Sequence, residues 1–336
     1  CAPGPVTHRV FIDGQAGTTG LEIHARLRER SDLHLLEIDP RHRKDPSARR
    51  DLLNAADLVV LCLPDEAARE AVALIDSPSV RVLDASSAHR TAPDWTYGLA
   101  ELAAGQREAI AAARRVANPG CYPTGFLLLL RPLIDANLVP ADAAITVHAL
   151  SGYTGGGRAL VERYEARAAA GERVAPRSYA LGLAHKHLPE MRRHAGLAEV
   201  PLFSPMVGDF ARGMLVQIPL TRPLVRAGTT PQALASVLAE RYATEPCVHV
   251  HEAGAQEVLL DGGFLDPEAR NGSNAVDLMV FGHGQQQLLV ARLDNLGKGA
   301  GGAAVQNLNL MLGGAEYTGV DTGRDTAAGT HARAIA

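Results

Sequence analysis

A short strand followed by three evenly spaced glycines is the feature that most restricts how this chain can fold. Residues 8–13 have the apolar content of a strand, and Gly14, Gly17 and Gly20 follow them. Residues 21–30 then have the apolar spacing of an amphipathic helix. This order is typical of a dinucleotide-binding unit, because bare backbone can approach a pyrophosphate at the helix N-terminus. The spacing is GxxGxxG rather than GxGxxG, so a plain strand–helix turn is the alternative.

The alternation of strand and helix continues beyond this turn. Apolar runs at residues 33–38, 58–63 and 80–83 have the length of strands, and the Ala-rich segment 66–75 has a helical pattern. Strands that alternate with helices predict a parallel sheet with crossover helices.

Charged residues after the second predicted strand bear on the type of dinucleotide. An acidic residue here, Asp39, would bind the ribose 2′-hydroxyl of NAD, whereas Arg41 and Arg43 would accommodate the 2′-phosphate of NADP. The surplus of basic residues favours NADP. NAD binding and a merely solvated charge run are the alternatives.

A cysteine lies on a second turn, residues 118–124 (Asn-Pro-Gly-Cys-Tyr-Pro-Thr), just before the apolar segment 125–138. This segment is predicted to be a buried helix, so Cys121 would lie at its N-terminus. Exposed N–H groups and the helix dipole favour a thiolate there. Because the thiolate is the nucleophilic form, Cys121 is a candidate covalent catalyst, with a packed core cysteine as the alternative.

Composition restricts the class of protein. A chain of 336 residues is long enough for two domains, and 46% hydrophobic with 21% charged residues is typical of a globular protein. The net charge of −4 gives no basic surface for nucleic acid or an anionic membrane, and no apolar run approaches the roughly 20 residues that a bilayer needs. The four cysteines lie far apart, no secretion leader is evident, and zinc-finger spacing is absent. We therefore expect a cytoplasmic protein without a metal.

Six segments resemble the N-acetyl-gamma-glutamyl-phosphate reductases of arginine biosynthesis, within the semialdehyde dehydrogenase superfamily. They occur in family order and extend over nearly the whole chain, at residues 11–21, 84–90, 118–124, 151–158, 185–190 and 294–300. The Gly-Thr-Thr-Gly-Leu and His-Leu-Pro-Glu-Met segments resemble the shorter subtype of that family. The cysteine and histidine segments are the most specific.

The resemblance implies an α/β protein with two domains. A Rossmann-type NADP-binding domain would occupy residues 1–120 and be completed by a C-terminal helix at 298–318. A mixed α/β catalytic and dimerisation domain, of the glyceraldehyde-phosphate/semialdehyde dehydrogenase kind, would occupy 121–297. Residues 319–336 are small and polar and are expected to form a loosely ordered tail. A homodimer or homotetramer is expected.

The resemblance also implies a reaction, in which NADPH reduces an acyl phosphate through a thioester on Cys121 and phosphate is released. His187 would be the acid/base, with His185 as the reserve candidate. Pro189 in a first helical turn would bring Glu190 close to His187, where a carboxylate can orient the ring.

The other expected site residues bind substrate and cofactor. Arg90 and Arg158 are candidates for the phosphate and carboxylate of the substrate, because a guanidinium binds either group in bidentate fashion. Asn118 and Ser151 are also expected at the substrate. The expected dinucleotide contacts are Gly14, Gly17, Thr18, Thr19, Gly20, Arg41, Arg43, Ser86, Asn295 and Lys298.

Three other functions compete with this one. Aspartate-semialdehyde dehydrogenase, or another acyl-phosphate reductase of the superfamily, would use the same cysteine, histidine and glycine turn. A cofactor-binding regulator without catalysis would have no need for Cys121, His187 and Glu190 together. A thiol hydrolase or acyltransferase would leave the glycine turn unexplained.

Overall fold

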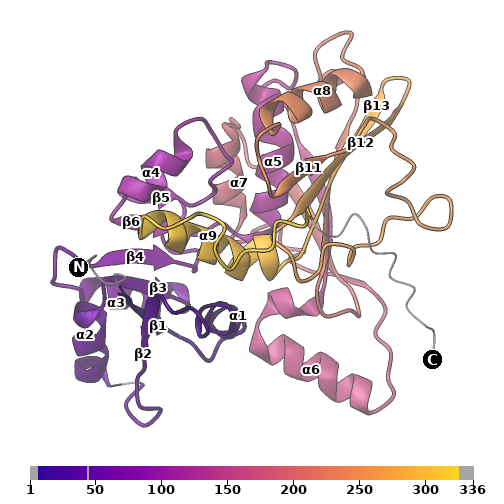
Figure 1. Cartoon of the computed structure of the whole chain (residues 1–336). Helices are drawn as coiled ribbons and strands as arrows, with labels where there is room; N and C mark the ends of the chain where they lie inside the picture. Colours follow the sequence, from indigo (N-terminus) through magenta and orange to yellow (C-terminus); the bar gives the residue numbers. More distant parts are fainter. Residues whose placement is uncertain (1–6, 44, 325–336) are drawn as a thin grey trace.

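The first part of the chain forms a six-stranded parallel sheet in the order β2-β1-β3-β4-β6-β5 (Figure 1). The structure is a computed structural model that describes residues 7–43 and 45–324. The strands are β1 His8–Asp13, β2 Leu33–Leu36, β3 Leu58–Leu61, β4 Arg81–Asp84, β5 Thr96–Tyr97 and β6 Arg115–Ala117. The predicted parallel sheet is confirmed.

Helices cover both faces of this sheet because its strands alternate their side chains between two apolar cores. Val10 and Ile12 of β1 lie in the core that contains residues of α1 and α4, whereas Phe11 lies in the core of α2 and α3. The helices are α1 Thr18–Leu27, α2 Pro46–Ala55, α3 Asp65–Ala73 and α4 Gln106–Ala112. Helix α1 begins before the predicted position 21, since Gly17 is already its N-cap.

The second part of the chain forms a seven-stranded mixed sheet in the order β11-β12-β13-β10-β7-β9-β8. Its strands are β7 Thr146–Ser151, β8 Arg177–Ser178, β9 Leu202–Val207, β10 Met214–Leu220, β11 Val248–Val250, β12 Val276–His283 and β13 Gln286–Leu293. The accompanying helices are α6 Arg158–Ala169, α7 Leu188–Ala195 and α8 Pro231–Arg241.

Helix α5, Cys121–Asp135, anchors the cysteine in the core of this second part. Residues 126–130 are all buried, so the helix is apolar on every side. It packs against β10 and β13 as well as α7 and α8. The helix begins before the predicted segment 125–138, and Cys121 is its first residue. The position of the thiol is therefore fixed by a rigid, fully packed element.

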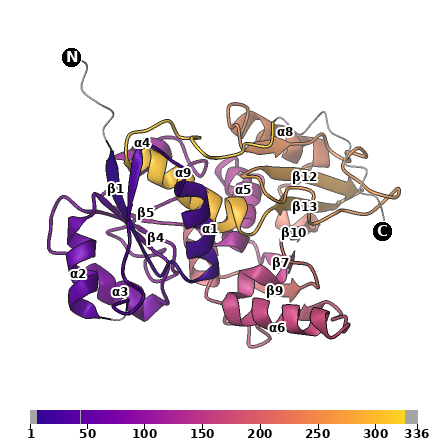
Figure 2. The same cartoon turned by 60° about the horizontal axis from the view of Figure 1, so that its bottom comes forward.

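The last helix returns to the first part of the chain, as Figure 2 shows for α9 beside α1. Ala304, Val305 and Leu308 of α9, Gly302–Met311, lie in the same core as Val10 and Ile23. The helix expected at 298–318 is shorter: a π-helical turn, Gly297–Gly301, precedes α9, and α9 ends at Met311.

The segment after α9 differs from the expected loose tail as far as it is described. Val320 is buried in the core beside α9, and the carbonyl of Asp321 accepts a 2.7 Å hydrogen bond from the amide of Asn274. The carbonyl of Thr322 lies 3.0 Å from Nε2 of His249. The remainder of the expected tail, residues 325–336, lies outside the described residues. Within residues 7–43 and 45–324, none of the helices combines the length and the apolarity needed to cross a bilayer.

Candidate active site

A cavity of about 960 Å³ is lined by residues from both parts of the chain. Ends of the first-sheet strands contribute Cys62, Ser86 and Asn118. The second part contributes Ser151 and His187. A cleft at the carboxyl ends of parallel strands is where α/β proteins bind nucleotides.

The glycine turn forms part of the lining of this cavity. Gly14 has a left-handed φ of 87°, and a Cβ there would collide with the carbonyl of Cys62. A Cβ on Gly20 would lie 2.6 Å from the carbonyl oxygen of Gly14. Gly17, Thr18 and Thr19 line the cavity, and no described side chain caps the N-terminus of α1. The free N–H groups of this first turn suit the pyrophosphate of a dinucleotide.

The remaining expected cofactor residues lie in different surroundings. Arg41 and Arg43 are exposed after β2 and do not line the cavity, and Arg41 is paired with Asp39. Ser86 lines the cavity, and its hydroxyl donates to Oδ2 of Asp84 at 2.8 Å.

The surroundings of Cys121 act on its thiol in opposite directions. Burial raises the pKa of Cys121 to about 11, against the opposing effects of Arg90, the amide of Tyr122 and Lys186. The helix N-terminus and the nearby cations therefore favour a thiolate, as expected, but the loss of solvation acts against it. A nucleophilic role for this thiol would need a base to accept its proton.

His187 is the more enclosed of the two histidines. It is 5% exposed, and its Nδ1 has no hydrogen-bond partner among the described residues. Burial, Arg90 and His185 lower its pKa well below the ordinary value, so the imidazole is neutral at pH 7. A Cβ on Gly120 would lie 2.8 Å from Nε2 of His187, which places the ring beside the residue that precedes Cys121.

His185 lines the cavity as well, but unlike His187 its Nδ1 has a hydrogen-bond partner. Its Nδ1 accepts the backbone N–H of His187 at 3.1 Å, and burial with Lys186 lowers its pKa to about 4. Both imidazoles are therefore neutral bases. The ring of His187, and not that of His185, supplies two of the three atoms nearest to a Cβ on Gly120.

Glu190 does not hydrogen-bond His187 among the described residues, which corrects the expected support of the ring. Its Oε1 accepts from the hydroxyl of Tyr97 at 2.6 Å and the amide of Gly120 at 2.7 Å, and its Oε2 accepts from Nη1 of Arg90 at 3.0 Å. A buried carboxylate needs strong hydrogen-bond donors, and these three donors bind the Glu190 oxygens in place of the imidazole. Glu190 thus holds the cysteine turn.

The four expected substrate residues differ in whether they line the cavity. Arg90, Asn118 and Ser151 line the cavity, whereas Arg158 does not. Arg90 donates to Glu190 and to the carbonyls of Asn118 and Ala85, which leaves two of its five N–H groups for a ligand.

Arg158, Asn118 and Ser151 all have partners within the protein. Arg158 is exposed and pairs with Glu162 at 2.7 Å. The Asn118 amide donates to the carbonyl of Ala300 at 3.0 Å, and the Ser151 hydroxyl donates to that of Gly152 at 3.0 Å.

Asn295 and Lys298, two of the expected dinucleotide contacts, are also bound to other groups of the protein. Asn295 lines the cavity, but its amide bonds the N–H of Gly213 and the hydroxyl of Thr154. Lys298 does not line the cavity, so a direct contact with the cofactor is not supported. Its Nζ donates to Glu101 at 2.7 Å and to Gln306 at 2.6 Å, because a buried ammonium requires a counter-charge.

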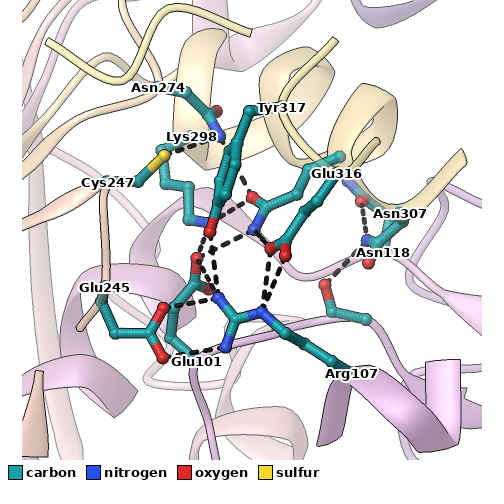
Figure 3. A network of polar contacts seen from close by, with 12 residues as sticks. Glu101, Arg107, Asn118, Glu245, Cys247, Asn274, Lys298, Asn307, Glu316 and Tyr317 are labelled. Carbon is teal, nitrogen blue, oxygen red and sulfur yellow. Dashed lines mark hydrogen bonds and ion pairs between the residues drawn. The ribbon is translucent and has the colours of Figure 1, made fainter. Parts of the chain in front are cut away.

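Figure 3 shows this ammonium within a wider polar network that joins the two parts of the chain. Arg107 of α4 pairs with Glu245 from the second part and with Glu316 beyond α9. The network fixes the π-helical turn, whose Gly299 lies against Cys121: a Cβ there would be 2.8 Å from Cβ of the cysteine.

Comparison with known proteins agrees with this arrangement. The sequence model of the semialdehyde dehydrogenase NAD binding domain matches residues 40–113, and that of the dimerisation domain matches residues 121–295. An N-acetyl-gamma-glutamyl-phosphate reductase of Burkholderia cenocepacia (strain HI2424) is 53% identical over 90% of this chain and 97% of its own length. N-acetyl-gamma-glutamyl-phosphate reductase 2 of a Nostoc species is 51% identical, over 93% and 99%. The chain belongs to the N-acetyl-gamma-glutamyl-phosphate reductase family.

Solved structures of semialdehyde dehydrogenases share the fold of this reductase-family chain. Aspartate semialdehyde dehydrogenase from Francisella tularensis superposes with a TM-score of 0.68 over 91% of this chain and 100% of its own, at 15% identity. The expected fold class, with a Rossmann-type domain and a mixed α/β domain, is confirmed.

Sequence reasoning missed Tyr97 and Glu101, although both are central to the arrangement around the family's cysteine and histidine. Tyr97 binds Glu190 and Glu101 binds Lys298, across 93 and 197 residues of sequence respectively. The sequence contains little that predicts a role for Glu101. Its one unusual feature is an acidic side chain directly after the apolar residues Leu99 and Ala100.

Replacing Lys298 by Met should destabilise the protein without a specific loss of cofactor binding. Removal of one partner leaves the Glu101 carboxylate buried and uncompensated, which costs about 3–5 kcal/mol. Urea unfolding would measure this cost, with Arg69→Met of the exposed Arg69–Glu66 pair as a control that changes stability by under about 0.5 kcal/mol. A folded Lys298→Met protein with about tenfold weaker NADPH binding would instead return Lys298 to the cofactor site.

Proposed function

We propose that this protein reduces N-acetyl-gamma-glutamyl phosphate to N-acetylglutamate semialdehyde with NADPH, through a thioester on Cys121. The observation that carries the proposal is one cavity that holds a cysteine at a helix N-terminus, a neutral buried imidazole and an uncapped glycine turn. The reductases that the chain resembles at 51–53% identity carry this activity in their names.

The first half of the reaction is acyl transfer to sulfur. Cys121 passes its proton to His187, the new carbon–sulfur bond forms, and the bond from the acyl carbon to the phosphate oxygen breaks. Phosphate leaves and a thioester remains. The neutral state of His187 supports this role, because only an unprotonated imidazole can accept the proton.

The second half is reduction of the thioester. A nicotinamide held in this cavity would supply hydride to the acyl carbon of the thioester, which is electrophilic because sulfur overlaps poorly with the carbonyl. The protonated His187 donates to the resulting oxygen, and then accepts that proton back as the carbon–sulfur bond breaks and the aldehyde leaves. Arg90 keeps two N–H groups available for an oxyanion.

The glycine turn and its surroundings fit a dinucleotide, and the NAD binding domain match supports this. We propose NADP rather than NAD, since Arg41 and Arg43 follow β2 and are exposed to solvent. The dimerisation-domain match supports a homodimer or homotetramer. The described cysteines are free thiols, in keeping with a reducing cytoplasm.

The decisive experiment measures phosphate-dependent reduction of NADP with N-acetylglutamate semialdehyde and, in parallel, with aspartate semialdehyde. A higher kcat/KM for the former is expected, and preference for the latter would refute the substrate assignment. Cys121→Ser should bind NADP normally in a fluorescence titration but lose turnover, because an oxygen ester accepts hydride poorly. Retention of more than a few per cent of activity would remove Cys121 from the nucleophile role.

His187→Asn should lower turnover by roughly 100- to 10,000-fold, the usual range for general acid–base catalysis, with little change in NADP affinity. Because both histidines have lowered pKa values, each is neutral above its own pKa and loses activity as a base only when the pH falls through that value. The wild-type profile should therefore show no histidine limb at pH 6–8. The matched control is His185→Asn, and a larger loss in that variant would move the acid/base role to His185.

Alanine at both Arg41 and Arg43 should raise the KM for NADPH about tenfold or more and leave that for NADH within about twofold, since only NADPH carries the 2′-phosphate. Steady-state kinetics with both cofactors measures the ratio. Equal effects on the two cofactors would show that these arginines lie in a solvated loop and do not recognise the 2′-phosphate.

A further inference from the structure

Lys186, between the two site histidines, is a cation without a partner at the cavity. Its side chain is exposed, it lines the cavity, and it makes no hydrogen bond or ion pair within residues 7–43 and 45–324. Basic side chains elsewhere in the site are bound to carboxylates. A free ammonium in the lining of this cavity is available to a ligand.

The other basic groups near the substrate are already neutralised. Arg90 and Lys186 supply the lysine and arginine side chains of the described cavity lining. Arg90 is paired with the buried Glu190 carboxylate at 3.0 Å, and Arg158 is exposed, paired with Glu162 and outside the lining. The uncompensated positive charge of this end of the cavity is therefore that of Lys186.

Lys186 lines the same cavity as Cys121, between the two histidines in the sequence. Burial is the main cause of the shifted pKa values of Cys121, His185 and His187, and the positive charge of Lys186 acts to lower all three. The acyl phosphate has its phosphoryl group one oxygen away from the carbon that Cys121 attacks, whereas the α-carboxylate is separated from that carbon by three more carbons. The phosphoryl group is therefore the substrate anion nearest to the sulfur, in the cavity that Lys186 also lines.

A lysine side chain is also well suited to bind the phosphoryl group. The chain contains only three lysines, Lys44, Lys186 and Lys298, among 33 basic residues. An ammonium is a compact point charge with three rotatable donors, so it can follow a phosphoryl group as it departs. The planar fork of an arginine would favour one fixed bidentate geometry.

We propose that Lys186 binds the phosphoryl group of the substrate, and orthophosphate in the reverse reaction. The inference rests on the proposed acyl-phosphate chemistry and adds to it the residue that recognises the leaving group. It replaces Arg158 as the second cation of the substrate site.

The test uses the reverse reaction, in which the semialdehyde and phosphate are varied separately. Lys186→Met should raise the KM for phosphate about tenfold or more while the KM for the semialdehyde stays within about twofold, and Lys186→Arg should recover part of the loss. Arg192→Met, which removes an exposed charge from the following helix α7, is the matched control and should leave both values unchanged.

The results distinguish the two anionic groups that Lys186 could bind, the phosphate and the carboxylate of the substrate. A rise confined to the KM for the semialdehyde would assign Lys186 to the carboxylate and overturn the proposal. An unchanged KM for phosphate with an altered pH dependence of kcat would overturn it too, and would show that the ammonium acts only through Cys121. If the wild-type protein uses aspartate semialdehyde instead, the proposed function fails, while the phosphate KM of Lys186→Met still decides this inference.

Chemical labelling gives a readout that does not depend on turnover. Trinitrobenzenesulfonate reacts with exposed amines, and with only three lysines in the chain each site can be resolved by peptide mass spectrometry. Phosphate should protect Lys186 at least about threefold, whereas sodium chloride at equal ionic strength should not. Equal labelling rates with and without phosphate would contradict the proposal.

Discussion

The buried carboxylate of Glu190 holds together the segments that form the catalytic end of the cavity. Its donors come from Arg90 after β4, Tyr97 of β5 and the amide of Gly120 before α5. Burial of a carboxylate is costly unless such donors are present, so each donor is fixed in place by the others. The position of His187, three residues before Glu190, and of Cys121, one residue after Gly120, both follow from this single group.

The electrostatics of the site keep its reactive groups neutral until substrate binds. Burial raises the pKa of Cys121 and lowers that of His187, and the two shifts favour a thiol–imidazole pair over a thiolate–imidazolium pair. In the reaction proposed above, a phosphoryl anion bound near His187 would have the opposite effect on the imidazole, since a negative charge stabilises its protonated form. The substrate would then assist the transfer of the thiol proton to His187.

Local patterns in the sequence were sufficient to predict several elements of the first sheet and helix α5, but not where each helix begins. The strand at 8–13, the glycine turn and the helix that follows Gly120 all depend on neighbours within a few residues. The partners of buried charges could not be predicted in this way. Glu190 was expected to bind the nearby His187, yet its donors lie 70, 93 and 100 residues away, and the thiol pKa depends on burial that only the complete fold defines.

The position of Lys298 outside the cavity lining has a specific geometric reason. Its neighbours Gly299 and Ala300 do lie at the cavity, where Gly299 packs on Cys121 and the carbonyl of Ala300 accepts from Asn118. Within a helical turn successive side chains point in different directions, so the next residue along need not share the same environment. Lys298 points instead into the network of Glu101 and Gln306. One π-helical turn thus presents backbone to the cavity on one side and is fixed by a buried ion pair on the other. This arrangement couples the position of Cys121 to the contact between the two parts of the chain.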